Sequence, residues 1–113
     1  MVTDSQLSDL RAALTTAQID YVKDLEHLVN IDCGTYNKKG VDQVGTWFAG
    51  QMKELGASVE TVAHETLGDT LVCVLEGSGN RSGLLVGHLD TVFPDGTVAG
   101  VYGRLMTQLF RLD

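Results

Sequence analysis

The sequence is short of positive charge and has no long apolar run. Eight lysine and arginine residues stand against fifteen aspartates and glutamates, which gives a formal net charge of -7 and a pI near 4.7. A chain this acidic repels phosphate backbones and anionic lipid headgroups. No window approaches the roughly 20 apolar residues that a helix needs to span a bilayer. We therefore expect neither a nucleic-acid partner nor a membrane partner.

Cysteine is also scarce, since the chain holds only Cys33 and Cys73. Two cysteines this far apart form neither a disulfide framework nor the closely spaced pairs of a zinc knuckle. Residues 1–15 include two aspartates and lack the apolar stretch of a secretory signal. Reduced thiols without a secretion signal are typical of a cytoplasmic protein, and we expect that location.

What the sequence does contain is enough material for one globular domain. Of its 113 residues, 43% are hydrophobic, and a folded domain of this length buries roughly 65% of the surface that its unfolded chain exposes. Apolar residues recur at helical spacing over residues 5–31, as one helix or as two that abut near residues 15–16. They recur again over 41–55, where steps of 3, 4, 4 and 3 keep them on one face. Gly56 then stands where a left-handed C-cap belongs.

Strand patterns follow the two predicted helices. Residues 58–62 alternate between apolar and polar, as a strand with one solvated face does. Residues 70–75 (TLVCVL) and 83–87 (GLLVG) are continuously apolar, which favours strands buried on both faces. The order of elements predicts an α/β fold in which two N-terminal helices pack on a partial mixed sheet.

The residues whose side chains can bind a metal or take part in catalysis come directly after the last predicted strand. His88 and Asp90 stand two positions apart, and side chains at i and i+2 of a strand point to the same face. Ligands of open α/β sheets bind at that end of the strands. A neutral imidazole binds zinc, and a nearby carboxylate fixes its tautomer. Such a pair is also commonly a structural hydrogen bond, and one histidine is not enough for a catalytic zinc, which takes three protein ligands.

Three stretches carry a resemblance to a known family. Residues 87–92 (GHLDTV) resemble the first metal motif of the zinc-dependent metallopeptidase family that contains aminoacylase, carboxypeptidase G and succinyl-diaminopimelate desuccinylase. Residues 32–37 (DCGTYN), followed by 40–45 (GVDQVG), are similar to a loop and helix start of the glutamate carboxypeptidase branch. Residues 93–97 (FPDGT) continue that branch's pattern. The resemblance runs from about residue 25 to residue 97.

The resemblance implies the N-terminal part of a zinc-peptidase catalytic domain. It assigns His88 as a ligand of one of two zinc ions, and Asp90 as the catalytic aspartate that orients this histidine. In complete enzymes of the family the two zinc ions share a bridging carboxylate and an activated water, and a glutamate acts as general base. The substrate that it implies is a small peptide or an N-acyl amino acid, cleaved at an amide bond next to a free carboxylate.

The family pattern stops after Thr97, and residues 98–113 form an atypical tail. Within that tail Val101, Leu105, Leu109 and Leu112 step by 4, 4 and 3, which predicts a short amphipathic helix. The family's bridging aspartate and its later ligands have no counterpart here. We therefore treat residues 1–113 as a single partial catalytic domain, and expect weak or absent zinc binding and self-association through exposed strand edges.

Two functions remain open at this point, and so do the roles of Tyr36 and Asn37. The chain is either a zinc metallopeptidase of amide bonds next to a carboxylate or a truncated, noncatalytic α/β fragment with no activity of its own. Tyr36 and Asn37 either face the substrate or pack the loop. His27 is expected at a surface or helix boundary, and His64, beside a predicted turn, is not expected to bind metal.

Overall fold

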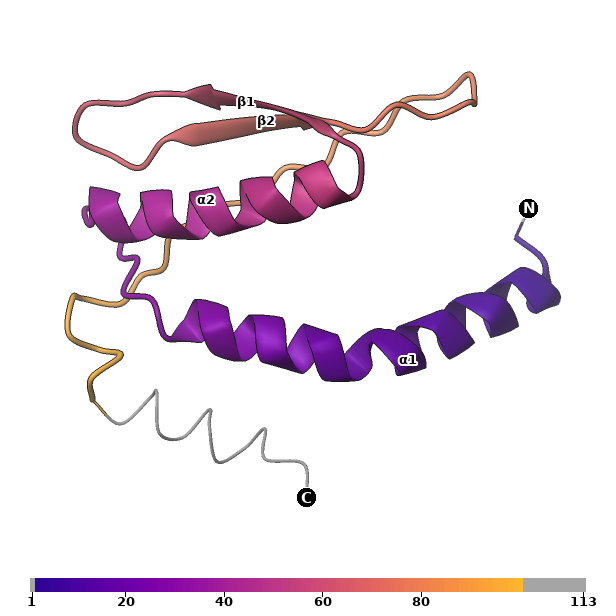
Figure 1. Cartoon of the computed structure of the whole chain (residues 1–113), viewed down its shortest axis with the longest axis horizontal. Helices are drawn as coiled ribbons and strands as arrows, with labels where there is room; N and C mark the ends of the chain where they lie inside the picture. The colour runs from indigo at the N-terminus through magenta and orange to yellow at the C-terminus, as the bar shows by residue number, and fades with distance from the viewer. Residues whose placement is uncertain (1, 101–113) are drawn as a thin grey trace.

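The fold is known from a computed structural model, which describes residues 2–100. In chain order the elements are α1 (Asp4–Val29), α2 (Lys38–Glu54), β1 (Ser58–Val62) and β2 (Thr70–Val74) (Figure 1). The predicted α/β class is confirmed, with two helices and a small antiparallel sheet. The amphipathic helix predicted for the tail lies outside the described residues.

Helix α1 is continuous, without a break at residues 15–16. Thr3 is its N-cap, and it forms a capping box with Gln6 in which each side chain accepts the other's backbone N–H. No residue of α1 is buried, and its predicted apolar stripe is largely exposed to solvent: Leu7 47%, Leu10 55% and Leu14 62%. Figure 1 shows the N-terminal half of α1 running clear of the rest of the molecule. The helix joins the core near its C-terminal end, through Leu28.

Helix α2 has the predicted apolar face and the predicted end. Val41 and Val44 are buried on that face, whereas Phe48, further along it, remains 39% exposed. Leu55 is the C-cap, and Gly56 has a φ of 88°. Glycine adopts this left-handed conformation without steric cost, so the helix ends where the sequence indicated.

Strands β1 and β2 form a two-stranded antiparallel sheet, with Ser58 opposite Val74 and Val62 opposite Thr70. The prediction that the second strand would be buried on both faces is wrong. Its residues alternate in burial, and Val72 and Val74 are each nearly half exposed. Helix α2 contacts both strands and the described residues place no further layer on the other face, so only alternate side chains are covered.

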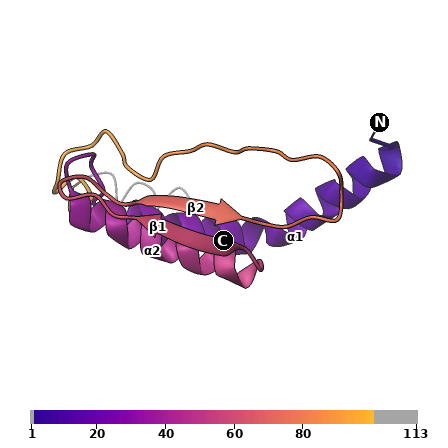
Figure 2. The ribbon, with the colours of Figure 1, turned by 90° about the horizontal axis from the view of Figure 1, so that it is seen from above.

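The third predicted strand, residues 83–87, is not formed. This segment is irregular, and its apolar side chains are almost fully exposed: Leu84 88%, Leu85 99% and Val86 86%. Figure 2 shows the chain leaving β2, turning and passing back clear of the hairpin. An apolar run becomes a strand only where a neighbouring strand supplies hydrogen bonds, and the described residues supply none here. The sheet is therefore an antiparallel pair and not the mixed sheet that was predicted.

The core is small and lies beside the loop that joins α1 to α2. Cys33, Val41 and Val44 are its buried members, and partly buried hydrophobics pack against them: Leu28, Ile31 and Leu89. Cys33 is buried and Cys73 is partly buried, and neither forms a disulfide in the structure. Among the residues that the structure describes, neither helix combines the length and apolar character that a bilayer crossing requires.

Candidate functional site

His88 and Asp90 flank a residue that is anchored in the core. Leu89, between them, packs against the cluster of Cys33 and Val44, so the two polar residues are held at the edge of that cluster. The His88 side chain is 80% exposed and that of Asp90 is 30% exposed. The segment is irregular, so the strand geometry on which the sequence argument relied is wrong. The two side chains nevertheless meet.

The contact between these residues determines which nitrogen of His88 carries the proton. His88 Nδ1 lies 2.7 Å from the backbone carbonyl oxygen of Asp90 and 3.1 Å from its carboxylate oxygen Oδ1. Both oxygens only accept hydrogen bonds when the carboxyl is ionised, so Nδ1 is the donor. In the neutral ring Nε2 then has the lone pair. This is the tautomer that a histidine needs in order to bind a metal ion through Nε2.

Asp90 is held in its charged form by its hydrogen bonds. The Thr35 hydroxyl donates to Oδ2 of Asp90 at 2.5 Å, and this bond is the main reason why the pKa of the Asp90 carboxyl lies below its usual value. Partial desolvation acts in the opposite direction, and the contact with His88 lowers the pKa further. The carboxylate is therefore ionised at neutral pH and available to His88.

Thr35 reaches Asp90 because two distant segments lie side by side. The Thr91 N–H donates to the Cys33 carbonyl oxygen at 2.8 Å, and Gly34 forms a parallel bridge with Thr91. A Cβ atom at Gly34 would lie 2.6 Å from the Phe93 carbonyl oxygen. Only glycine allows the loop to approach this closely without a shift of one backbone.

A second set of contacts ties the loop to the residues after the pair. The Asp32 carboxylate accepts the backbone N–H groups of Gly96 at 2.9 Å and Val98 at 3.1 Å. Asn37 donates to Asp95 Oδ1 at 2.9 Å and also caps α2 by accepting from the Gly40 N–H. These contacts support loop packing as the role of Asn37.

Tyr36 differs from its neighbour Asn37. Its side chain is 90% exposed, so packing of the loop does not account for it.

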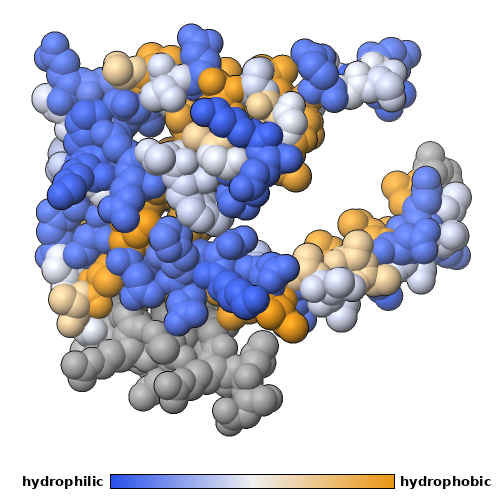
Figure 3. Space-filling view, in the orientation of Figure 1, coloured by the Kyte–Doolittle hydropathy of each residue, from blue (hydrophilic) through white to orange (hydrophobic). Residues whose placement is uncertain are grey.

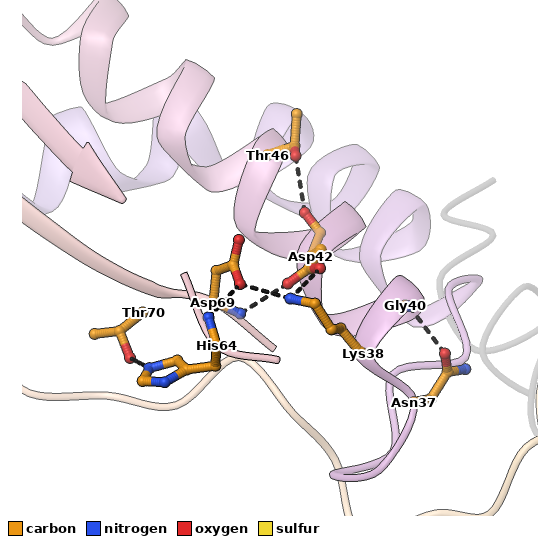
Figure 4. Close-up of polar contacts among 8 residues, drawn as sticks. All are labelled: Asn37, Lys38, Gly40, Asp42, Thr46, His64, Asp69 and Thr70. Carbon is orange, nitrogen blue, oxygen red and sulfur yellow. Dashed lines mark hydrogen bonds and ion pairs between the residues drawn. The ribbon is translucent and has the colours of Figure 1, made fainter. Parts of the chain in front are cut away.

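The other two histidines have structural contacts instead of a place in this site. The His64 side chain lies 3.0 Å from the Thr70 hydroxyl, and its backbone N–H donates to Asp69 (Figure 4). His27 stacks at a tilt on Trp47 with ring centroids 6.1 Å apart, which joins α1 to α2. The contacts of His64 and His27 are thus with residues other than His88 and Asp90.

The pair lies between two hollows of the surface. A cavity of about 590 Å³ opens beside it, between the end of α1, α2 and the 88–98 segment, and its walls are mainly apolar. A second hollow of about 820 Å³ is bounded by α2, the sheet and the 83–90 segment. His88, Leu89 and Asp90 line both. Small molecules can therefore approach the imidazole.

The donor set in the described residues is incomplete for a zinc site. Over residues 2–100 there is no cluster of three or more histidine, cysteine, aspartate or glutamate side chains placed to hold a metal ion. His88 supplies one nitrogen, and Asp90 is engaged as its hydrogen-bond partner. A catalytic zinc takes three protein ligands, so the residues present fit one part of such a site.

Thr35 is the site residue that sequence reasoning missed. A threonine 55 positions before its partner gives no local signal, because only the fold brings the two together. The one available hint was its place in the 32–37 stretch, where a resemblance was noted without a role for the hydroxyl.

No family model matches the chain. Carboxypeptidase G2 of Pseudomonas sp. (strain RS-16) is 36% identical to it over 89 residues, a match that covers 77% of this chain and 21% of the relative. The chain thus spans about a fifth of the length of the curated relative that it matches. With the His88–Asp90 geometry in place, this similarity supports a carboxypeptidase G-like family for the chain.

Proposed function

We propose that this chain supplies a zinc ligand and its orienting carboxylate to a carboxypeptidase G-like metallohydrolase, which cleaves amide bonds next to a free carboxylate. His88 is the ligand, through Nε2, and Asp90 is the catalytic aspartate that orients it. One observation carries the proposal: both Asp90 acceptors face Nδ1, so the exposed Nε2 has the lone pair. The similarity to carboxypeptidase G2 supports the reaction class.

In this site zinc would supply the reactive chemistry, His88 would bind it and Asp90 would orient His88. Zinc, when bound, polarises a carbonyl and lowers the pKa of bound water. The proposed site has two zinc ions, as the resemblance implies, and needs further ligands from outside residues 2–100. The substrate class is a small peptide or an N-acyl amino acid. A cytoplasmic location belongs to the same proposal, supported by the two unpaired thiols.

A second function is favoured by the donor count. The described residues hold no metal-binding cluster of three groups, and one imidazole does not assemble a two-metal centre. The isolated 113-residue chain is on this account a noncatalytic α/β fragment. The two proposals are compatible, because the first concerns the site to which the pair belongs and the second concerns the chain by itself.

Zinc titration followed by NMR tests whether His88 is the ligand. We expect zinc to bind weakly at pH 7 and to shift the ring signals of His88 more than those of His64 or His27, because only His88 presents a nitrogen oriented by Asp90. His88→Ala should abolish the effect. His64→Ala is the matched control and should leave the His88 shifts unchanged. Zinc-induced shifts at His64 or His27 with none at His88 would contradict the proposal.

A further inference from the structure

The Asp90 carboxylate is shared between two residues that are far apart in the sequence. His88 Nδ1 faces Oδ1 at 3.1 Å, and the Thr35 hydroxyl donates to Oδ2 at 2.5 Å. Each partner thus occupies a different oxygen of one carboxylate. A carboxylate held at both oxygens has a single preferred rotamer, whereas one held at Oδ1 alone is free to turn about its side-chain torsions.

The position of Thr35 is fixed independently of Asp90. The residues on either side of it are tied to the 91–98 segment by the backbone bond from Thr91 to Cys33 and by the side chains of Asp32 and Asn37. The hydroxyl is therefore presented by an anchored loop. Loss of this one hydroxyl removes a bond to Asp90 and leaves the other contacts of the loop in place.

We infer that Thr35 is a positioning residue of the proposed zinc site, which holds the Asp90 carboxylate against His88 Nδ1 and so keeps Nε2 as the metal-binding nitrogen. The consequence for zinc binding rests on the proposed function, whereas the orientation of the Asp90 carboxylate against His88 Nδ1 is a property of the metal-free chain. Thr35 acts through Asp90 and is assigned no contact with metal or substrate. The Asp90 carbonyl also accepts from Nδ1 at 2.7 Å, so loss of the hydroxyl weakens the preference for this tautomer without abolishing it.

Three variants test this inference. Thr35→Val keeps the shape and removes the donor, Thr35→Ser restores a donor, and Thr46→Val is the matched control. The Thr46 hydroxyl donates to the Asp42 carbonyl oxygen at 2.8 Å within α2. The first measurement uses the metal-free chain at a pH where the ring is neutral, and reads the tautomer of His88 from the ¹⁵N shifts of its two nitrogens. If Thr35 had only a structural role in the loop, its substitution would leave the ¹⁵N shifts of His88 unchanged.

We expect Thr35→Val to shift the His88 nitrogens toward a mixture of tautomers, and Thr35→Ser and Thr46→Val to resemble the wild type. In a zinc titration read at His88, the affinity should fall in Thr35→Val by less than the roughly 10- to 100-fold that loss of a direct partner of a zinc-binding histidine costs. The serine variant should recover it. If Thr35→Val does not fold, Thr35→Ala takes its place.

Unchanged ¹⁵N shifts in the folded valine or alanine variant would overturn the inference, as would a serine variant that resembles the valine one. Failure of the proposed function looks different. In that case zinc leaves His88 unshifted even in the wild type, while the tautomer measurement still decides the role of Thr35.

Discussion

Lys38 links two carboxylates that come from different parts of the fold. Its ammonium group lies 2.9 Å from Asp42, one turn further along α2, and 2.5 Å from Asp69, which precedes β2 (Figure 4). The Asp69 N–H donates to Asp42 at 2.7 Å, and the His64 N–H donates to Asp69. These bonds hold the β1–β2 connection against the N-terminal part of α2.

The pKa values of this cluster predict a pH dependence of stability. The hydrogen bond from Lys38 lowers the pKa of both Asp42 and Asp69 from about 3.8, and the bonds to the two carboxylates raise the pKa of Lys38 from about 10.5. A lowered carboxyl pKa stabilises the fold above the unfolded value, and a raised lysine pKa stabilises it below the unfolded value. The contribution is therefore complete between about pH 5 and pH 9 and is lost as the pH falls below about 4 or rises past about 10.5.

Replacement of Lys38 tests this dependence. Lys38→Met should lower the thermal midpoint at pH 7, because two carboxylates lose their shared partner, and the difference from the wild type should shrink as the pH falls below about 3.8 and the carboxylates become protonated. Lys39→Met removes the same charge from an exposed neighbour and should have little effect. Circular dichroism melts of the three proteins provide the comparison. A wild-type advantage that stays constant as the pH falls from 7 through the acid range would show that ion pairing with Lys38 is not its cause.

Among the individual site residues, His88 and Asp90 could be identified from the sequence, but Thr35, which holds Asp90, could not. His88 and Asp90 were found because they are two positions apart and lie in a stretch that resembles a family motif. The reason given for their contact, a shared strand face, was wrong, since the segment is irregular. Thr35, which holds Asp90, was not found, because a hydrogen bond across 55 positions depends on the path of the whole chain.

Elements defined by local signals were predicted well. Helix α2 has its predicted apolar face and ends at Gly56 with a positive φ, and β1 covers residues 58–62 as expected. Caps, turn residues and periodicity act within a few positions, so they can be identified without knowledge of the fold.

Elements that depend on distant partners were predicted poorly. The 83–87 run has the composition of a buried strand, yet it is irregular and exposed. The apolar stripe of α1 at Leu7, Leu10 and Leu14 is likewise exposed. Composition indicates which side chains gain from burial, but another segment must supply the surface that buries them.

Because these apolar segments lack a covering partner among the described residues, the molecule as a whole exposes a large amount of apolar surface. Figure 3 shows orange patches both on α1 and on the part of the molecule that contains the hairpin. Among the described residues β1 and β2 pair only with each other, and the 84–86 run is at least 86% exposed. Unpaired strand edges and exposed apolar runs favour pairing with other chains. We propose that the isolated chain self-associates through these segments.

Light scattering over a range of protein concentrations tests this proposal. We expect the mean mass to rise with concentration, and Leu85→Lys to reduce the rise, because a charge on the exposed run opposes strand pairing. Leu10→Lys adds the same charge on α1, where no strand edge is available, and should have a smaller effect. A monodisperse monomer with a cooperative thermal transition would show that the chain is self-sufficient.

We propose that His88 and Asp90 belong to a zinc hydrolase site, which the described residues complete only in part. Hydrolysis of an N-acyl glutamate by the purified 113-residue chain with added zinc measures whether this partial site is sufficient for catalysis. We expect a rate equal to that of zinc without protein, and the same rate for Asp90→Ala, because one imidazole and its carboxylate provide neither a second metal nor a general base. Turnover that survives purification and disappears in Asp90→Ala would show instead that the chain forms a complete catalytic site.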